Sequence, residues 1–416
     1  MLISAVCFFK KGALMSSHQE AIQAMELAER RIFAASAEAP LRNLVNLADR
    51  QQVRSCLEDS LGTARLPLPA ITIQGTGQLA LEGCSLQLLH GESWEKVAVT
   101  AHLFCPSTPP PWPVVLICCG HGAQGKVSYD AMGLRLAQQG AAALIPDNIG
   151  QGERIPMGHT YATAAFAAGV SVQGLIVKET LAWIDWLRGD SRFTRLGAAG
   201  NSGGGTLTMC LGALSDDIEA MVSSGYPSSF ELVARKQKRH CHCNLFPGSI
   251  GNFEMWELYS LFAPRPLLLM QGSRDVLFLQ DTFLATARKV RDIYQHMQAE
   301  DAFDSAVPPG EHSWDPNRRA MIGTFFAQQF DLRPPNENDE EQAPMLTMET
   351  SKCLSSWPEN AIDIEALAWK LTGKQPQPAP PLWEIFPPQL LPPWPIVSER
   401  GATEQILAQM ECFLKK

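Results

Sequence analysis

The sequence predicts an α/β fold in which a mainly parallel sheet is covered by helices on both faces. Short, wholly apolar runs alternate along the chain with amphipathic stretches of helix length, which is typical of repeated strand–helix–strand units. Runs of this kind predict parallel strands that are buried on both sides. The predicted strands are 114–118, 141–145, 196–199, 220–223, 266–270 and 302–307, and the predicted helices are 129–139, 172–188, 203–214, 282–298 and 318–330.

An alternating pattern precedes the buried runs. Between residues 71 and 104, apolar residues recur at every second position on either side of a His90-Gly91-Glu92 segment. A period of two is typical of a strand with one buried face, and a glycine-containing segment between two such strands predicts a turn. We therefore expect an antiparallel hairpin at one edge of the sheet, built on Leu79, Leu81, Leu86 and Leu88 before the turn and Val97, Val99, Ala101 and Leu103 after it.

Changes of composition divide the chain into three parts. Residues 1–66 form a predicted N-terminal helical arm, because residues 19–61 show helical periodicity. Residues 67–332 hold the alternating strands and helices and form the predicted main domain. Residues 333–416 form an acidic and Pro-rich C-terminal extension, with a short helix expected over 404–413. The arm and the extension could each cover a pocket or bury a contact between subunits, so a monomer and a homo-oligomer both stay open.

The charge and hydropathy of the chain exclude two classes of partner. The formal net charge of −9 at pH 7 opposes binding to a polyanion, so no nucleic acid is expected. The apolar runs are shorter than the roughly 20 residues that span a bilayer, so we expect no membrane segment and a cytoplasmic protein. The 11 cysteines are scattered without the regular spacing of a disulfide scaffold, which predicts reduced thiols.

The segment Gly200-Asn201-Ser202-Gly203-Gly204 carries the clearest chemical signal. It follows one predicted strand and begins a predicted helix, so the serine lies on a sharp turn between the two. Such a turn is strained and crowded, and small flanking residues leave room for it. It would expose the Ser202 hydroxyl as a nucleophile. It would also place the Gly203 N–H at a helix N-terminus, where it can stabilise a developing oxyanion.

A serine nucleophile needs a base that is held by a third group, and the chain supplies both in the order Ser, Asp, His that accompanies this kind of turn. Asp275 follows the predicted strand 266–270, and His312 lies in a turn before the predicted helix 318–330. We assign His312 as the general base and acid, and Asp275 as the group that orients it. Asp147 also follows a strand but precedes the serine, which predicts that it braces its own loop.

The loop after the first buried strand, Cys119-Gly120-His121-Gly122-Ala123-Gln124-Gly125, is the expected source of a second oxyanion donor. We assign the Ala123 N–H to this role, together with Gly203. Gly122 is expected beside the substrate, because glycine lets a backbone approach closely. His121 is expected to shape the loop from a buried position. Trp314 is expected in the substrate-binding site, because it follows His312 by two residues.

These motifs resemble the acetylxylan-esterase and dienelactone-hydrolase-like branch of the α/β hydrolases. The resemblance implies the α/β-hydrolase fold and a metal-independent serine esterase that needs no cofactor. Such an enzyme removes small acyl groups, such as acetyl, from a small-molecule or carbohydrate ester, with Ser202, Asp275 and His312 in the catalytic positions. It leaves the acyl and alcohol portions of the substrate open. The matching segments are Gly120-His121-Gly122, 147–154, the turn at Ser202, 263–268 before Asp275, and Gly310-Glu311-His312.

Two other functions stay open. A serine peptidase of the prolyl-oligopeptidase type would use the same three residues, and a catalytically silent hydrolase fold would only bind a partner. Activity on peptide anilides without activity on esters would favour the peptidase. Failure of a serine-directed probe to label Ser202 would favour the silent fold.

The segment His240-Cys241-His242-Cys243 contains residue types that bind metals. Four adjacent side chains cannot all point at one tetrahedral ion, and a second Cys/His pair at a normal zinc spacing is missing from the sequence. We therefore expect no metal site. The same region contains Arg235-Lys236-Gln237-Lys238-Arg239, which could form a basic lip over the site or a solvated helix face.

Overall fold

One nine-stranded sheet runs through the computed structural model, which describes residues 42–122, 124–159, 163–235, 241–249, 251–340 and 343–376. The strands lie in the order β1-β2-β3-β5-β4-β6-β7-β8-β9. From β5 to β9 in this order the strands are parallel, and β1, β2 and β3 form an antiparallel edge. The predicted α/β fold with a mainly parallel sheet is therefore confirmed. The strands are β1 Thr72–Leu81, β2 Cys84–Glu92, β3 Ala98–Pro106, β4 Trp112–Cys118, β5 Ala142–Pro146, β6 Phe193–Asn201, β7 Ala220–Ser224, β8 Leu267–Met270 and β9 Phe303–Ala306.

The antiparallel edge contains three strands, not the two of a single hairpin. The chain reverses between β1 and β2 at Glu82 and Gly83, where the glycine has a φ of +74°. The predicted turn at His90-Gly91-Glu92 lies inside β2, and Gly91 pairs with Ile73 on one side and Val99 on the other. That turn position is wrong because Gly83, which adopts positive φ at no steric cost, reverses the chain earlier.

Successive residues of the central strands face opposite sides of the sheet, as strand geometry requires. In β4, Val114 and Leu116 belong to a first core on one face, and Val115 and Ile117 belong to a second core on the other. Both faces of the strand are therefore buried. This double burial explains why the sequence shows continuous apolar runs here and not an alternation.

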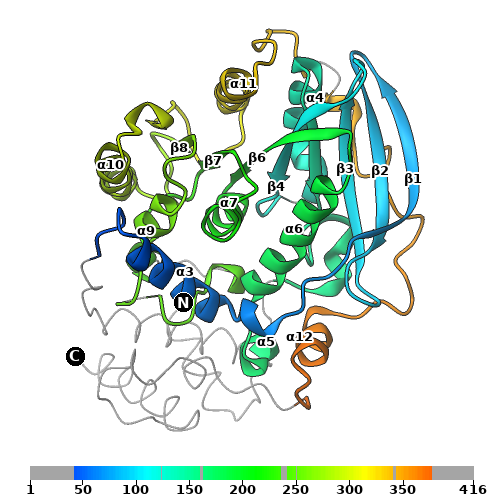
Figure 1. Ribbon diagram of the computed structural model, residues 1–416. Helices are drawn as coiled ribbons and strands as arrows, with labels where there is room; N and C mark the ends of the chain where they lie inside the picture. The colour runs from blue at the N-terminus through cyan, green and yellow to red at the C-terminus, as the bar shows by residue number, and fades with distance from the viewer. Residues whose placement is uncertain are drawn as a thin grey trace, which may run out of the picture.

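Helices cover both faces of the sheet (Figure 1). Side chains of α6, α7, α9 and α10 contribute to the first core, and side chains of α4 and α11 contribute to the second. The bounds of α6 and α7 are those that the sequence predicts. α11 begins earlier than predicted, because Asp315 caps it through the Arg318 N–H and Pro316 fits its first turn. The helices are α4 Asp130–Gln139, α5 Thr163–Ala168, α6 Val172–Arg188, α7 Gly203–Leu214, α8 Phe230–Arg235, α9 Met255–Ser260, α10 Gln280–His296 and α11 Pro316–Phe330.

The described part of the N-terminal arm packs onto the same domain. α3 (Leu47–Leu61) begins at Asn46, whose side chain accepts a hydrogen bond from a backbone N–H, and it ends at Gly62 in the left-handed conformation. The Arg50 guanidinium donates to three carbonyl groups at the end of α9, those of Ser260, Leu261 and Ala263. Three residues of α3 enter the first core, namely Val53, Leu57 and Leu61. The remainder of the predicted arm, residues 1–41, lies outside the described residues.

Residues 343–376 also pack onto the main domain. Leu346 and Cys353 belong to the second core, and α12 (Ile364–Thr372) lies beside α5 (Figure 1). In β3, buried His102 lies with Nε2 2.7 Å from the carbonyl oxygen of Ser351. The predicted helix over 404–413 and most of the Pro-rich stretch lie outside the described residues.

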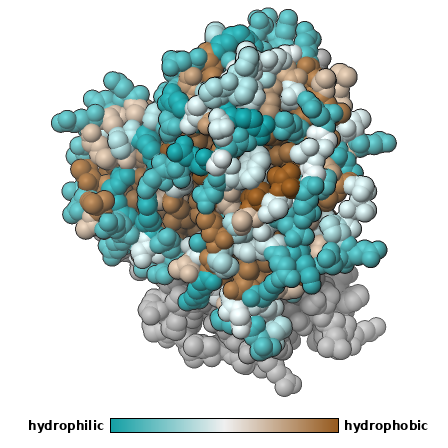
Figure 2. Space-filling view, turned by 45° about the vertical axis from the view of Figure 1, so that its right-hand side comes forward, coloured by the Kyte–Doolittle hydropathy of each residue, from teal (hydrophilic) through white to brown (hydrophobic). Residues whose placement is uncertain are grey.

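Figure 2 shows hydrophobic residues of the described part of the chain in patches among hydrophilic ones. Within the described ranges, every helix is either too short or too polar to cross a bilayer.

Candidate active site

The predicted nucleophile lies at the carboxyl edge of the parallel strands, where sites in open α/β sheets occur. Ser202 directly follows β6 and precedes α7, so it occupies the turn that the sequence predicts. Its φ of 59° and ψ of −122° form a backbone conformation that residues other than glycine rarely adopt. Its N–H donates to the carbonyl oxygen of Ser224 at 2.9 Å, which ties the strained turn to β7. Strain of this kind collects at functional sites.

Close backbone packing explains the glycines on either side of Ser202. A Cβ atom at Gly200 would lie 2.3 Å from the carbonyl oxygen of Gly204. A Cβ atom at Gly204 would lie 2.0 Å from the carbonyl oxygen of Cys118. Both distances are far inside van der Waals contact, so the turn requires glycine at these two positions.

The structure brings Asp275 and His312 together from the loops that follow β8 and β9. His312 Nδ1 lies 2.7 Å from Asp275 Oδ2. Asp275 Oδ1 accepts hydrogen bonds from the N–H groups of Leu277 and Phe278 at 2.8 and 3.0 Å. Burial raises the pKa of the Asp275 carboxyl, but the hydrogen bond and charge of His312, with these N–H groups, outweigh burial and hold the pKa below its usual value. Asp275 is therefore ionised at neutral pH, and it accepts a hydrogen bond from the Nδ1–H group of His312.

His312 approaches the Ser202 turn across Gly225, which directly follows β7. A Cβ atom at Gly225 would lie 3.2 Å from His312 Cε1 and 2.7 Å from the side-chain oxygen of Asn201. Gly225 has a φ of +62°, so its backbone conformation also favours glycine. His312 and the residue before the predicted nucleophile thus contact the same glycine.

The loop after β4 also reaches the Ser202 turn. A Cβ atom at Gly120 would lie 3.2 Å from Ser202 Cβ, so this backbone passes directly beside the serine. The Gly122 N–H donates to the Gly120 carbonyl oxygen at 2.8 Å, which makes the loop tight. Gly203 is the first residue of α7, at the helix N-terminus where the sequence places an oxyanion donor. Ala123, the predicted second donor, lies outside the described residues.

Trp314 packs against Tyr129, which in turn contacts the loop after β4. It is half-buried and packs against the second core, and its ring centroid lies 5.5 Å from that of Tyr129. The Tyr129 hydroxyl accepts a hydrogen bond from the Gly120 N–H at 2.6 Å, and burial raises the pKa of this phenol. Trp314 therefore supports the loop through Tyr129. Its contact with substrate stays a prediction.

A buried ion cluster holds the loop that follows β5. Asp147 accepts hydrogen bonds from Thr100 Oγ1 at 2.8 Å, from the Lys126 N–H at 2.8 Å and from Lys126 Nζ at 2.6 Å. Lys126 Nζ also donates to Glu153 at 2.6 Å. Burial raises the pKa of Glu153, but Lys126 and the N–H groups of residues 353–354 outweigh burial and lower the pKa. These contacts agree with the predicted bracing role of Asp147.

Known proteins are similar to this chain in sequence or in fold. Residues 99–242 match the Dienelactone hydrolase family. The chain is 25% identical over 213 residues to the "Putative hydrolase YtaP" of Bacillus subtilis (strain 168), a match that covers 47% of this chain and 71% of that protein. The structure of this chain is similar to that of Methylesterase BT1017, with a TM-score of 0.62 and 22% identity, over 84% of this chain and 74% of that one. It is also similar to a "putative acetyl xylan esterase" from Bacteroides fragilis NCTC 9343, with a TM-score of 0.55 and 17% identity, over 79% of this chain and 92% of that one.

The chain has the α/β-hydrolase fold. In this fold the nucleophile, the acid and the histidine follow one another along the chain and meet at the carboxyl edge of the sheet. Ser202 after β6, Asp275 after β8 and His312 after β9 occupy that order and that edge. The family match also spans the loop at residues 120–122 and the segment 147–154, on which the resemblance in the sequence rests.

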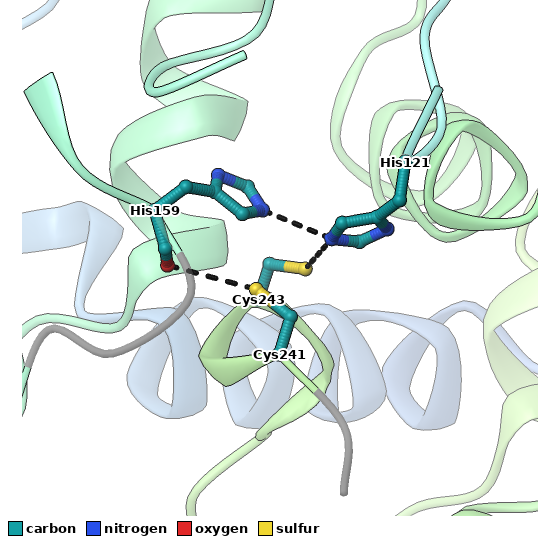
Figure 3. Close-up of side chains that lie close together, drawn as sticks. All are labelled: His121, His159, Cys241 and Cys243. Atoms are coloured by element: carbon teal, nitrogen blue, oxygen red, sulfur yellow. Dashed lines mark hydrogen bonds between the residues drawn. The ribbon is translucent and has the colours of Figure 1, made fainter. Parts of the chain in front are cut away.

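The fold brings together four side chains from three separate segments of the chain. His121 follows β4, His159 lies in the segment after β5, and Cys241 and Cys243 lie between β7 and β8 (Figure 3). One nitrogen or sulphur atom of each lies within 4.8 Å of the others. His121 is exposed, not buried as predicted, and its ring nitrogen lies beside the other three donor atoms.

The argument from sequence against a metal site considered only ligands at a normal zinc spacing. Two further residues that could hold an ion, His121 and His159, come from two distant loops. The signal in the sequence was a pair of histidines in loops after β4 and β5, since adjacent parallel strands end at one edge of the sheet. His242 lies apart from the cluster and packs against Phe166, with 5.5 Å between the ring centroids. Residues 236–240, most of the predicted basic lip, lie outside the described residues.

Proposed function

We propose that the protein is a serine ester hydrolase, with Ser202 as nucleophile, His312 as general base and acid, and Asp275 as the group that orients His312. Two observations support the proposal: Asp275 and His312 form a hydrogen-bonded pair, and both His312 and the residue before Ser202, which has a φ of 59°, lie against Gly225. A strained residue persists only where the surrounding structure imposes it, and active sites are where such strain is used. The match to the Dienelactone hydrolase family over residues 99–242 supports the proposal.

The reaction proceeds by two acyl transfers. Ser202 Oγ attacks the ester carbonyl carbon while His312 Nε2 accepts the hydroxyl proton. The Gly203 N–H and a second N–H from the loop after β4, which we assign to Ala123, stabilise the oxyanion. The intermediate collapses as His312 gives its proton to the leaving alcohol. Water then attacks the acyl-enzyme and gives a proton to His312, and that proton returns to Ser202 as the acid leaves.

The proposed substrate is an ester with a small acyl group, such as acetyl, on a small-molecule or carbohydrate alcohol. One similar structure is named as a methylesterase and another as an acetyl xylan esterase, and these names support an ester with a small acyl or alcohol part. The side chains and N–H groups assigned above suffice for every step, so the proposed reaction uses no cofactor.

The test is hydrolysis of p-nitrophenyl acetate, butyrate and octanoate by the wild type, by Ser202→Ala and by a control, Ser107→Ala. Ser107 is exposed and directly follows β3, so its loss leaves the site intact. We expect kcat/KM of Ser202→Ala to fall by about 10⁴-fold or more, and that of the control to stay near the wild type. Faster turnover of acetate than of octanoate, with acetate release from acetylated xylan, would support the small acyl group.

The absence of wild-type turnover on every ester would contradict the proposal. Cleavage of peptide anilides would then favour a serine peptidase. Failure of a fluorophosphonate probe to label Ser202 in the folded chain would favour a silent hydrolase fold.

A further inference from the structure

We propose that His121, His159, Cys241 and Cys243 bind a structural zinc ion beside the proposed active site. This inference goes beyond the proposed function, because ester hydrolysis by Ser202 requires no metal. It also departs from the expectation of no metal drawn from the sequence.

The positions of the four donor atoms fit a tetrahedral ion. With Zn–N of about 2.0 Å and Zn–S of about 2.3 Å, neighbouring ligand atoms lie about 3.3–3.8 Å apart. His121 Nε2 lies 3.1 Å from His159 Nε2 and 3.4 Å from Cys243 Sγ (Figure 3). All four donor atoms lie within 4.8 Å of one another. Even the widest pair therefore needs to approach by only about 1 Å to complete the tetrahedron.

The hydrogen bond of His159 leaves its second nitrogen available to a metal. His159 Nδ1 lies 2.7 Å from the carbonyl oxygen of Ile149. A carbonyl oxygen only accepts, so Nδ1 carries the proton and the lone pair of Nε2 faces His121. A metal-bound histidine usually donates its other ring N–H to a carboxylate, a backbone carbonyl or a water molecule, as His159 does here. The Gln151 amide nitrogen lies 3.3 Å from the same Nε2 and has to withdraw when the ion binds.

The two cysteines complete a donor set that favours zinc. Cys243 is buried, and the Asn244 side-chain amide lies 3.4 Å from its sulphur, where it can donate to a thiolate. Cys241 is half-buried, and its sulphur lies 3.6 Å from the His159 carbonyl oxygen, a contact that the thiol gives up on ionising. Two thiolates and two neutral imidazoles balance the charge of Zn²⁺. Sulphur and imidazole ligands in a tetrahedron select zinc over magnesium or calcium.

The site joins three loops, one of which passes beside the nucleophile. His121 lies between Gly120 and Gly122, and a Cβ atom at Gly203 would lie 2.9 Å from His121 Nδ1. Four protein ligands leave the ion no open position, which is typical of a structural site and not a catalytic one. The ion therefore fixes the loop after β4 to the segment between β7 and β8, and takes no part in a reaction step.

The test is the zinc content of the full chain, purified without a metal-binding tag and measured by inductively coupled plasma mass spectrometry. We compare the wild type, the double variant Cys241→Ser/Cys243→Ser and the control Cys56→Ser, which removes a half-buried thiol of α3. We expect about one zinc per chain in the wild type and the control, and a loss of at least about 90% in the double variant. Cobalt substitution should give the visible absorption bands and the sulphur-to-cobalt charge-transfer bands of a tetrahedral thiolate site in the wild type and the Cys56→Ser control, but not in the double variant.

If the double variant does not fold, the folded wild type still decides the question. Titration with a mercurial thiol reagent should release zinc, detected with a chromogenic chelator, as two thiols react. A wild type that holds no zinc and takes none up from a zinc buffer would overturn the inference, as would a disulfide between Cys241 and Cys243 seen by mass spectrometry after alkylation. Because metal content is the measured quantity, these outcomes are separate from failure of the proposed ester hydrolysis.

Discussion

Asp275 Oδ2 lies 2.7 Å from His312 Nδ1, and the other oxygen of the same carboxylate accepts two backbone N–H groups. The backbone of its own loop thus holds the carboxylate in place, and the carboxylate in turn orients the imidazole. Because an ionised carboxylate only accepts, the proton of a neutral His312 lies on Nδ1 and the lone pair lies on Nε2. This relationship sets the tautomer that the proposed chemistry needs.

Replacement of Asp275 by asparagine should remove the contact that sets the tautomer of His312. An amide can turn its N–H toward His312 and stabilise the opposite tautomer, so we expect kcat to fall by about 10⁴-fold with a smaller change in KM. The measurement is p-nitrophenyl acetate hydrolysis, with exposed Asp301→Asn as the control. An Asp275→Asn enzyme with wild-type kcat would show that His312 does not depend on this carboxylate.

Gly225 offers a test of the position of His312. A methyl group there would lie 3.2 Å from His312 Cε1, so Gly225→Ala should displace the imidazole and lower kcat by about 10- to 100-fold. Gly373 is a matched control, because its φ of +66° is close to the +62° of Gly225 and a Cβ atom there would meet nothing within 4 Å. Both variants should lose about 1 kcal/mol or more of unfolding free energy from backbone strain. Equal kcat in the two variants would contradict the proposed position of the base.

The buried lysine of the ion cluster should be essential for stability. Lys126→Met would leave the carboxylates of Asp147 and Glu153 buried without their shared cation. We expect the free energy of unfolding to fall by about 3–5 kcal/mol, measured by urea denaturation. Lys352→Met, which changes an exposed lysine, should have little effect. A similar loss in both variants would mean that the cluster contributes nothing specific.

Glu153 gives this cluster a defined dependence on pH. Burial would raise its pKa, but Lys126 and two backbone N–H groups hold it below the ordinary value of 4.5. A carboxyl whose pKa is lower in the folded chain stabilises the fold fully above its unfolded pKa, and that contribution is lost as the pH falls through the folded pKa. The difference in unfolding free energy between wild type and Glu153→Gln should therefore be constant at neutral pH and should shrink below pH 4.5.

Denaturant unfolding at a series of pH values checks this expectation. Exposed Glu300→Gln is the control and should differ from the wild type by an amount that does not change with pH. A difference between wild type and Glu153→Gln that grows in acid would contradict the lowered pKa.

The parallel half of the fold follows from the sequence, because strands that are buried on both faces must be apolar at every position. The antiparallel edge is harder to predict. Leu79 and Leu81 have odd numbers and Leu86 and Leu88 have even ones, so the alternation changes phase between them. That change of phase marks the reversal at Gly83, which a simple count of leucines at alternate positions overlooks.

The candidate catalytic residues could be predicted because each follows a strand, and parallel strands deliver their ends to one edge. The four-residue cluster could not be predicted in the same way. Cys241 and Cys243 lie in a long connection between β7 and β8, and the path of that connection depends on packing against α6 and α7. The sequence contains the ligands, but only the folded chain shows that they meet.

The ties between Glu153 and residues 353–354, and between His102 and Ser351, also bear on the order in which the chain is completed. The loop that carries Glu153 is synthesised long before the segment that satisfies its carboxylate. A nascent chain can therefore form the central sheet and still leave this acidic group without two of its partners. A ribosome that stalls before residue 350 would therefore release a chain in which Glu153 keeps Lys126 but lacks both N–H donors, so that this carboxylate contributes less to stability at neutral pH.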